Sequence, residues 1–257
     1  MTADVFFGCA FIAEGPALAL YVFFIATEPL RIIGLIAGAF FWLHSLLISS
    51  LVWIMARVII DNKKGPTQKY LLILGAFVSV YIQMMFRFAY YKLNKKASEG
   101  LKSQNPGETA PSMSLLAYVS GLGTGIMSGV FSFWNTLSDS LGPYTVGIHG
   151  DSPAFFLYSA FMTDVIILLH VFWEIVFFDG CEKFKWGILL IVLGTHLLVS
   201  AQTHISSYYG INLISAFIIL VLMKTWAFLA AGGLCRSLKL CLLMQDKNFL
   251  LYNNRSR

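Results

Sequence analysis

The sequence predicts an all-α integral membrane protein with seven transmembrane helices, a lumenal or extracellular N-terminus and a cytosolic C-terminus. Hydrophobic residues make up 58% of the 257-residue chain, charged residues only 12%, and the mean hydropathy is +0.74. Soluble domains carry about 25% charged residues, so this composition excludes an ordinary soluble domain. The apolar residues also form runs of about 20, the length that a helix needs to cross a bilayer.

The apolar runs divide the chain into seven predicted spans within a single membrane domain that covers residues 1–257. We place them at about residues 5–26, 32–52, 70–91, 115–135, 155–178, 186–205 and 211–233, followed by a basic tail at 234–257. Glu14 and Pro16 interrupt the first span, and Arg87 lies near the end of the third. The longest polar stretch, residues 92–113, contains the turn sequence Asn105-Pro106-Gly107 and is expected to link spans three and four.

The distribution of basic residues between the loops predicts the orientation. With the N-terminus outside, the inner loops and the tail hold Arg31, Lys92, Lys95, Lys96, Lys102, Lys183, Lys185, Arg236, Lys239, Lys247, Arg255 and Arg257. The outer loops hold only Lys63, Lys64 and Lys69. Cytosolic loops carry an excess of Lys and Arg, so we expect the N-terminus to be lumenal or extracellular. The same excess explains the net charge of +5 without nucleic acid.

Small residues recur at every fourth position of the fourth span, at Ala117, Gly121, Gly125 and Gly129. We call these four residues the glycine stripe. On a helix they form one face with almost no side chains, which allows a second helix to approach closely in lipid. The stripe predicts a helix contact used in assembly, or alternatively a packing face used only inside this chain. It indicates no chemistry.

The fourth residue of every block of ten, from Asp4 to Asn254, shows a regularity of another kind. The one-letter codes at these 26 positions run in alphabetical order, wrap round once and never use C, P, R or V. No structural period acts on letter names. We interpret these positions as substitutions imposed on a natural sequence and give them no weight as functional evidence.

Ionisable residues inside a membrane span are candidates for function. They are Glu14, His44, Asp164, His170, Glu174, His196, His204 and Lys224. Read at face value, the histidines with Glu174 suggest a metal site, and Lys224 with Asp164 suggests a retinal Schiff base with its counter-ion. Glu174 is expected to face His170 one helical turn away.

Both suggestions depend on the imposed series, because only His170 and His196 lie outside it. Two histidines do not complete a zinc site, so we favour histidines that are buried and hydrogen-bonded between helices. We therefore expect no catalytic, metal-binding or cofactor-binding residues and no cofactor. The alternative, a seven-span metal-dependent membrane hydrolase that uses His170 and His196, needs a third ligand from outside the series.

Several stretches resemble the anterior-pharynx-defective (Aph) subunit family of γ-secretase, in particular its B-type branch. They are FFGCAFIA, GAFFWL, FRFAYYKL, AYVSGLG, GIMSGVFS, VGIHGDSP, LLHVFW, FFDGCEK and WAFLAAGG, and the resemblance covers essentially the whole chain apart from the imposed positions. It implies a non-catalytic scaffold that assembles with presenilin, nicastrin and presenilin enhancer. The complex cleaves type I membrane proteins such as Notch and amyloid precursor protein.

The resemblance also implies roles for particular residues. Gly121, Gly125 and Gly129 match the family's assembly glycines, and His170 and His196 match its two membrane-embedded histidines, which support assembly and activity from the core. The implied location is the membrane of the endoplasmic reticulum, Golgi and cell surface. Glu14, Asp164, Glu174 and Lys224 depart from the family, which has apolar or small residues there.

Overall fold

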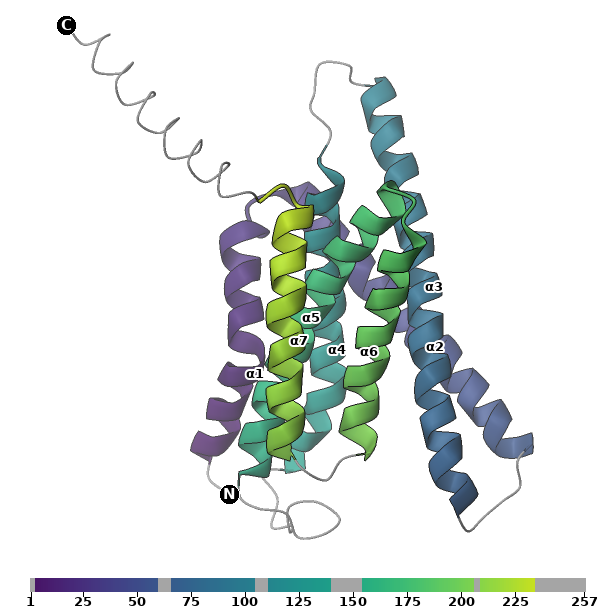
Figure 1. The fold of residues 1–257 in the computed structure, drawn as a ribbon. Coiled ribbons are helices and arrows are strands. Elements are labelled where there is room, and N and C mark those ends of the chain that lie inside the picture. The colour runs from purple at the N-terminus through teal and green to yellow at the C-terminus, as the bar shows by residue number, and fades with distance from the viewer. Residues whose placement is uncertain (1–2, 60–65, 105–110, 140–153, 206–208, 234–257) are drawn as a thin grey trace, which may run out of the picture.

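The computed structural model describes residues 3–59, 66–104, 111–139, 154–205 and 209–233. Within these ranges the chain forms seven α-helices and no strand. They are α1 (Ala3–Phe24), α2 (Pro29–Ile59), α3 (Pro66–Gln104), α4 (Met113–Asp139), α5 (Phe155–Glu182), α6 (Trp186–Ile205) and α7 (Tyr209–Ala230). Figure 1 shows α1, α4, α5, α6 and α7 as an upright bundle, while α2 and α3 lean away from it at one end.

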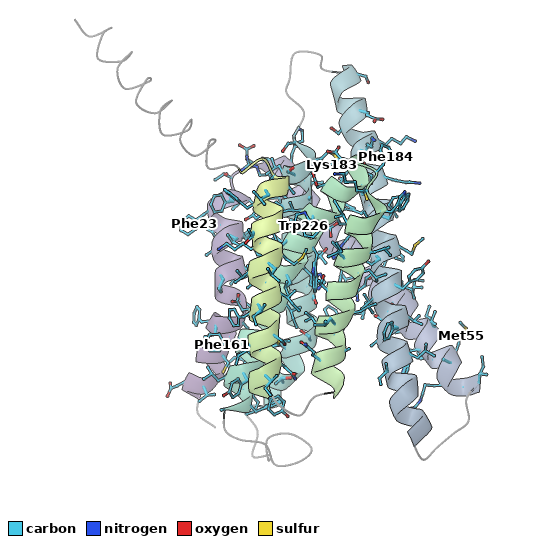
Figure 2. All side chains as sticks on the ribbon, viewed as in Figure 1. Phe23, Met55, Phe161, Lys183, Phe184 and Trp226 are labelled. Atoms are coloured by element: carbon cyan, nitrogen blue, oxygen red, sulfur yellow. The ribbon has the colours of Figure 1, made fainter. Side chains whose placement is uncertain are left out.

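Six of these helices are long and apolar enough to cross a membrane, and α6 contributes a shorter apolar segment, Trp186–Gln202. Large apolar side chains such as Phe23, Met55 and Phe161 project outward from the helices (Figure 2). A helix can present such residues to lipid because its backbone groups bond to one another. The prediction of an all-α membrane protein is confirmed for the described residues.

Helix α5 forms the centre of the molecule. It packs against α1, α3, α4, α6 and α7, and 67% of its apolar segment is buried, compared with 50% for α4 and 17–22% for α1, α2, α3 and α7. The sequence of α5 allows this position because apolar residues occur on all sides of the helix, as is typical of a buried helix. Any residue that changes the placement of α5 therefore affects five neighbouring helices.

Helix α3 is longer than the predicted span, because it continues from Tyr91 through the lysine-rich residues to Gln104. Lys, Ala and Glu are good helix formers, so a polar extension of the helix is stable outside the apolar layer. Part of the predicted link between spans three and four is thus helical. Residues 105–110, which include the expected turn, lie outside the described residues.

Candidate functional site

The glycine stripe of α4 lies against α5 of the same chain. A Cβ atom on Gly121 would lie 2.8 Å from the Cα atom of Val171, and one on Gly125 would lie 2.6 Å from the carbonyl oxygen of Ile167. Both contacts are with backbone, which cannot rotate out of the way as a side chain can. The stripe therefore brings the α4 and α5 backbones into direct contact, and a side chain larger than hydrogen would separate them.

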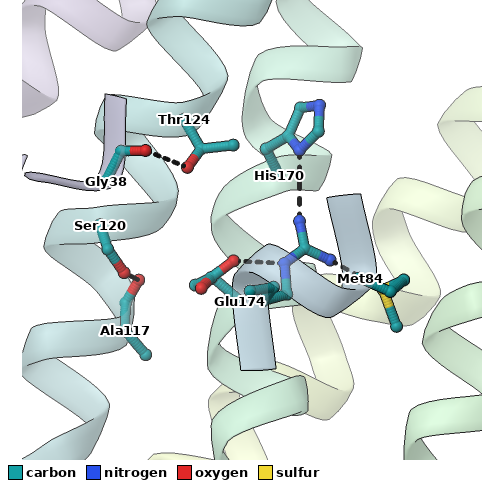
Figure 3. A network of polar contacts seen from close by, with 8 residues as sticks. Gly38, Met84, Ala117, Ser120, Thr124, His170 and Glu174 are labelled. Carbon is teal, nitrogen blue, oxygen red and sulfur yellow. Dashed lines mark hydrogen bonds and ion pairs between the residues drawn. The ribbon is translucent and has the colours of Figure 1, made fainter. Parts of the chain in front are cut away.

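The opposite face of α4 makes an equally close contact with α2. A Cβ on Gly38 of α2 would lie 2.5 Å from the carbonyl oxygen of Ser120, and a Cβ on Gly123 would overlap the carbonyl of Leu35. Thr124 Oγ1 donates to the carbonyl of Gly38 at 3.3 Å (Figure 3). Helix α4 is thus held between α2 and α5 by small residues on both faces.

His170 and His196 lie together in the core, with relative exposures of 2% and 5%. Their ring centroids are 5.3 Å apart and the rings are perpendicular. Trp173 stacks on His196 at 4.4 Å, and its Nε1 donates to Thr195 Oγ1 at 3.0 Å. The aromatic contacts therefore join α5 to α6 through the two histidines predicted to lie in the core. The expected hydrogen bond between helices is not found for His196 Nδ1, which is buried without a hydrogen-bond partner.

Arg87 of α3 reaches into this cluster. Its Nε forms an ion pair with Glu174 Oε2, and both side chains are almost fully buried, at 5% and 4% exposure. Its Nη2 lies 3.4 Å from His170 Nδ1 (Figure 3). A guanidinium group can only donate, so Nδ1 of His170 accepts and the ring proton is on Nε2.

The expected pairing of Glu174 with His170 is therefore wrong, because the carboxylate pairs with Arg87 instead. Spacing along α5 identified the residue one turn away, but a longer side chain from another helix reaches the acid first. The available signal was a lone arginine inside the apolar run of span three. Its partner depends on how α3 lies against α5, which a single sequence does not show.

The remaining ionisable candidates form no ion pair with one another in the described part of the chain. His44 is exposed and its Nδ1 lies 3.0 Å from the carbonyl of Phe40 on its own helix. Lys224 is exposed on α7, whereas Asp164 on α5 is half-buried, and no ion pair joins them in the described part of the chain. The Oδ1 atom of Asp164 is buried without a hydrogen-bond partner. The side chain of His204 lies outside the described residues.

Glu14 lies where α1 meets the end of the glycine stripe. The side chain is half-buried, and its Oε1 is 2.8 Å from the place that a Cβ on Gly129 would occupy. The acid thus occupies space that the glycine leaves free. Its position is one of packing between α1 and α4.

No group of three or more His, Cys, Asp or Glu side chains that could hold a metal ion occurs among the described residues. His170 and His196 lie near each other, but their neighbours are Trp173, Arg87 and Glu174, and Arg87 takes up both Glu174 and one nitrogen of His170. A metal-dependent hydrolase that uses these histidines therefore has no support in this geometry. The cluster instead ties α3, α5 and α6 together.

Comparisons with known proteins place this arrangement in context. Residues 4–234 match the family model described as Aph-1 protein. The chain is 90% identical to human Gamma-secretase subunit APH-1B and 58% identical to zebrafish (Danio rerio) Gamma-secretase subunit Aph-1b, each over the full length of both proteins. It is 40% identical to Gamma-secretase subunit Aph-1 of Drosophila melanogaster, covering 93% of this chain and 98% of the fly protein. The similarity thus extends across the whole bundle.

Proposed function

Because the chain belongs to the Aph-1 family, we propose that it is a non-catalytic scaffold subunit of γ-secretase, an intramembrane aspartyl protease complex. The observation that carries this proposal is the 90% identity with human Gamma-secretase subunit APH-1B over the full length of both chains. A match of that extent includes every helix of the bundle, the loops between them and the two termini.

The proposed partners are presenilin, nicastrin and presenilin enhancer, and the proposed role is to stabilise presenilin and nicastrin. Cleavage of type I membrane proteins such as Notch and amyloid precursor protein then belongs to the assembled complex. The charge distribution supports a lumenal N-terminus and a cytosolic tail. In this proposal the chain forms one seven-span domain, and it is located in the membranes of the endoplasmic reticulum, Golgi and cell surface.

The environment of the polar core supports a structural role over a catalytic one. Arg87 and Glu174 neutralise each other, His170 accepts from Arg87, and Trp173 donates to Thr195. Side chains whose hydrogen bonds go to one another fix helix positions. We assign Arg87, Glu174 and His170 the task of holding α3 to α5 through these bonds, and His196 the task of holding α6 to α5 through its ring contacts with Trp173 and His170.

The glycine stripe supports assembly through α5 in this proposal. Gly121, Gly125 and Gly129 fit α4 closely against the central helix, so they influence where the outer faces of the four other helices packed against α5 lie. Partner subunits recognise those outer faces. The sequence left two uses of the stripe open, internal packing and assembly. In this proposal the stripe serves assembly by packing α4 against α5 inside the chain.

The alphabetical positions are proposed to be substitutions in a natural B-type sequence. A tenth of 257 residues is about 26, which equals the number of positions in the series and the extent of difference from human APH-1B. Glu14, Asp164, Glu174 and Lys224 then replace apolar or small residues. The chain's function is that of its parent, reduced to the degree that those residues of the series without a compensating partner, such as Asp164, disturb insertion and packing.

Expression in cells that lack the native subunit tests the proposal. We expect nicastrin and presenilin to co-purify with the chain and Notch cleavage to be restored at least in part. Co-purification of neither protein, in cells where the chain is present in the membrane at normal amounts, would show that it is no scaffold of this complex. A variant with the parental residues at all 26 positions serves as the positive control.

A further inference from the structure

An amphipathic cavity opens between the second half of α3 and the turn that joins α5 to α6. Its volume is about 210 Å³, and it is lined by Phe88, Tyr91, Lys92, Lys95, Gly180, Cys181, Phe184, Lys185, Trp186 and Leu189. We call it the α3–α6 pocket. It is separate from the buried cluster around His170 and shares no lining residue with the contacts described there.

The floor of the α3–α6 pocket is apolar and comes from three helices. Its apolar lining includes Phe88 and Tyr91 of α3, Gly180 of α5 and Leu189 of α6. A Cβ on Gly180 would lie 2.8 Å from Leu189 Cδ1, so the glycine lets α6 approach α5 and close the floor. Such a surface accepts a hydrocarbon chain and excludes water.

The rim of the pocket is basic. Lys92, Lys95 and Lys185 line it, and Lys92 and Lys95 share one face of α3 because they are three residues apart. Lys92 Nζ lies 4.7 Å from the ring centroid of Phe88. No ion pair joins these lysines to a carboxylate in the described ranges, whereas neighbouring Lys183, which does not line the pocket, pairs with Asp179 at 2.7 Å.

The pocket lies at the level where the apolar part of the bundle ends. Phe184, labelled in Figure 2, is 76% exposed, and Trp186 at the start of α6 is 67% exposed. Aromatic side chains gather at the boundary between hydrocarbon and head groups. Lysines at the same level can extend their stems along apolar surface while the ammonium groups reach the head groups.

We propose that the α3–α6 pocket binds one anionic glycerophospholipid. Its phosphate and anionic head group lie among Lys92, Lys95 and Lys185, and the start of one acyl chain lies on Phe88, Tyr91 and Leu189. Anionic lipids favour basic pockets between transmembrane helices, with each lysine contributing to the attraction. A zwitterionic lipid gains less, because its own cation lies near the three lysines.

The three lysines lie outside the alphabetical series, so the charge of the site does not depend on it. Phe184 does belong to the series and has a left-handed backbone conformation, with φ of 53°. Its ring lies 6.0 Å from Lys95 Nζ. The site is therefore defined by the lysines and the floor, and the Phe184 ring adds to its wall.

Trp186 provides a probe for the experiment. The full chain is placed in nanodiscs of phosphatidylcholine that contain a small fraction of brominated phosphatidylserine or, separately, brominated phosphatidylcholine. Bromine on the acyl chain quenches indole fluorescence at contact. The signal of Trp186 is obtained as the difference between the chain and its Trp186→Phe variant. We expect phosphatidylserine to quench Trp186 at concentrations roughly tenfold or more below those of phosphatidylcholine.

The paired variants K92Q/K185Q and K96Q/K183Q test whether the pocket or the general surface charge is responsible, since both remove the same charge from the same end of the bundle. We expect K92Q/K185Q to abolish the preference and K96Q/K183Q to keep it. Equal loss in both pairs, or equal quenching by both lipids in the unmodified chain, would overturn the proposal.

Discussion

At the scale of single residues, one arginine determines which polar side chains of the core have a partner. Arg87 enters from α3 and engages both Glu174 and His170 of α5. Burial of a charge is costly unless a partner and hydrogen bonds compensate it. Glu174 is compensated in this way, whereas Asp164, two and a half to three turns earlier on the same helix, has an unpartnered buried oxygen.

This difference predicts opposite effects for two substitutions that restore a small or apolar residue. Glu174→Gly leaves Arg87 buried without its carboxylate, which costs about 3–5 kcal/mol. Asp164→Leu removes an unsatisfied group and gains about 1–3 kcal/mol. We expect the yield of nicastrin–presenilin complex in cells lacking the native subunit to fall for Glu174→Gly and to rise for Asp164→Leu.

Glu174→Gln is the matched control, because it keeps a hydrogen-bond acceptor for Arg87 but removes the charge. Its complex yield should lie between that of the unmodified chain and that of Glu174→Gly. Rescue by Glu174→Gly together with no effect of Asp164→Leu would contradict the argument from partnered and unpartnered charge.

The histidine pair leads to a prediction about metal content. The cluster supplies two imidazoles and no further free ligand among the described residues, so we expect the purified chain to contain no stoichiometric metal and to have no hydrolytic activity. Elemental analysis after purification without chelators provides the measurement. One zinc per chain that disappears in His170→Ala or His196→Ala would refute this expectation.

At the scale of secondary-structure elements, the α4–α5 contact depends on missing side chains. Gly121 and Gly125 of α4 face the α5 backbone at distances that no Cβ could maintain. Attraction between membrane helices comes largely from close packing, because lipid tails are as apolar as leucine. A loss of close approach therefore cannot be compensated by added hydrophobic area.

Leucine at a stripe position should accordingly weaken assembly. For Gly121→Leu or Gly125→Leu we expect α4 and α5 to separate, at a cost of about 1–3 kcal/mol or more from overpacking, and co-purification with nicastrin and presenilin to fall several-fold. Ile126→Leu is the control on the same helix, since Ile126 is half-buried and the swap conserves volume. Equal yields for the stripe variants and this control would mean that the close α4–α5 contact is not needed for assembly.

At the scale of the whole molecule, a buried central helix and a one-sided distribution of basic residues describe the protein. Helix α5 is surrounded by five others. The ends of α3 and α5, the start of α4 and the end of α7 lie at the same end of the bundle (Figure 1). The lysine-rich part of α3 and the α3–α6 pocket share that end. The positive-inside rule assigns it to the cytosol.

Labelling with a membrane-impermeant maleimide tests this orientation. Asp4 and Ser103 are both exposed and lie near opposite ends of the bundle. In intact cells we expect Asp4→Cys to react and Ser103→Cys to react only after permeabilisation. The background control is the chain without the new cysteine: Cys9 and Cys181 are buried, and Cys235 and Cys241, which lie outside the described residues, are replaced by serine in the control and in both variants. The reverse pattern would show that the N-terminus is cytosolic.

The sequence alone was sufficient for the class of the protein, its helical architecture and its family resemblance. These properties follow from composition, from the length of apolar runs and from motifs read along the chain, all of which are local. The same holds for the identity of the helix-contact residues, because the spacing of Gly121, Gly125 and Gly129 places them on one face of any helix. Burial of His170 and His196 was also expected from their place within apolar spans.

The tertiary structure decided which elements meet. The glycine stripe lies mainly against α5, and Glu174 pairs with Arg87 and not with its neighbour His170. Lys224 is exposed on α7 and forms no ion pair with Asp164 among the described residues. The physical reason is that every span in a membrane protein is apolar on most faces, so the pattern along one helix does not specify its partner. Partner choice depends on the fit of surfaces and the reach of long side chains across about 8–10 Å between helix axes. That fit exists only once the helices are assembled.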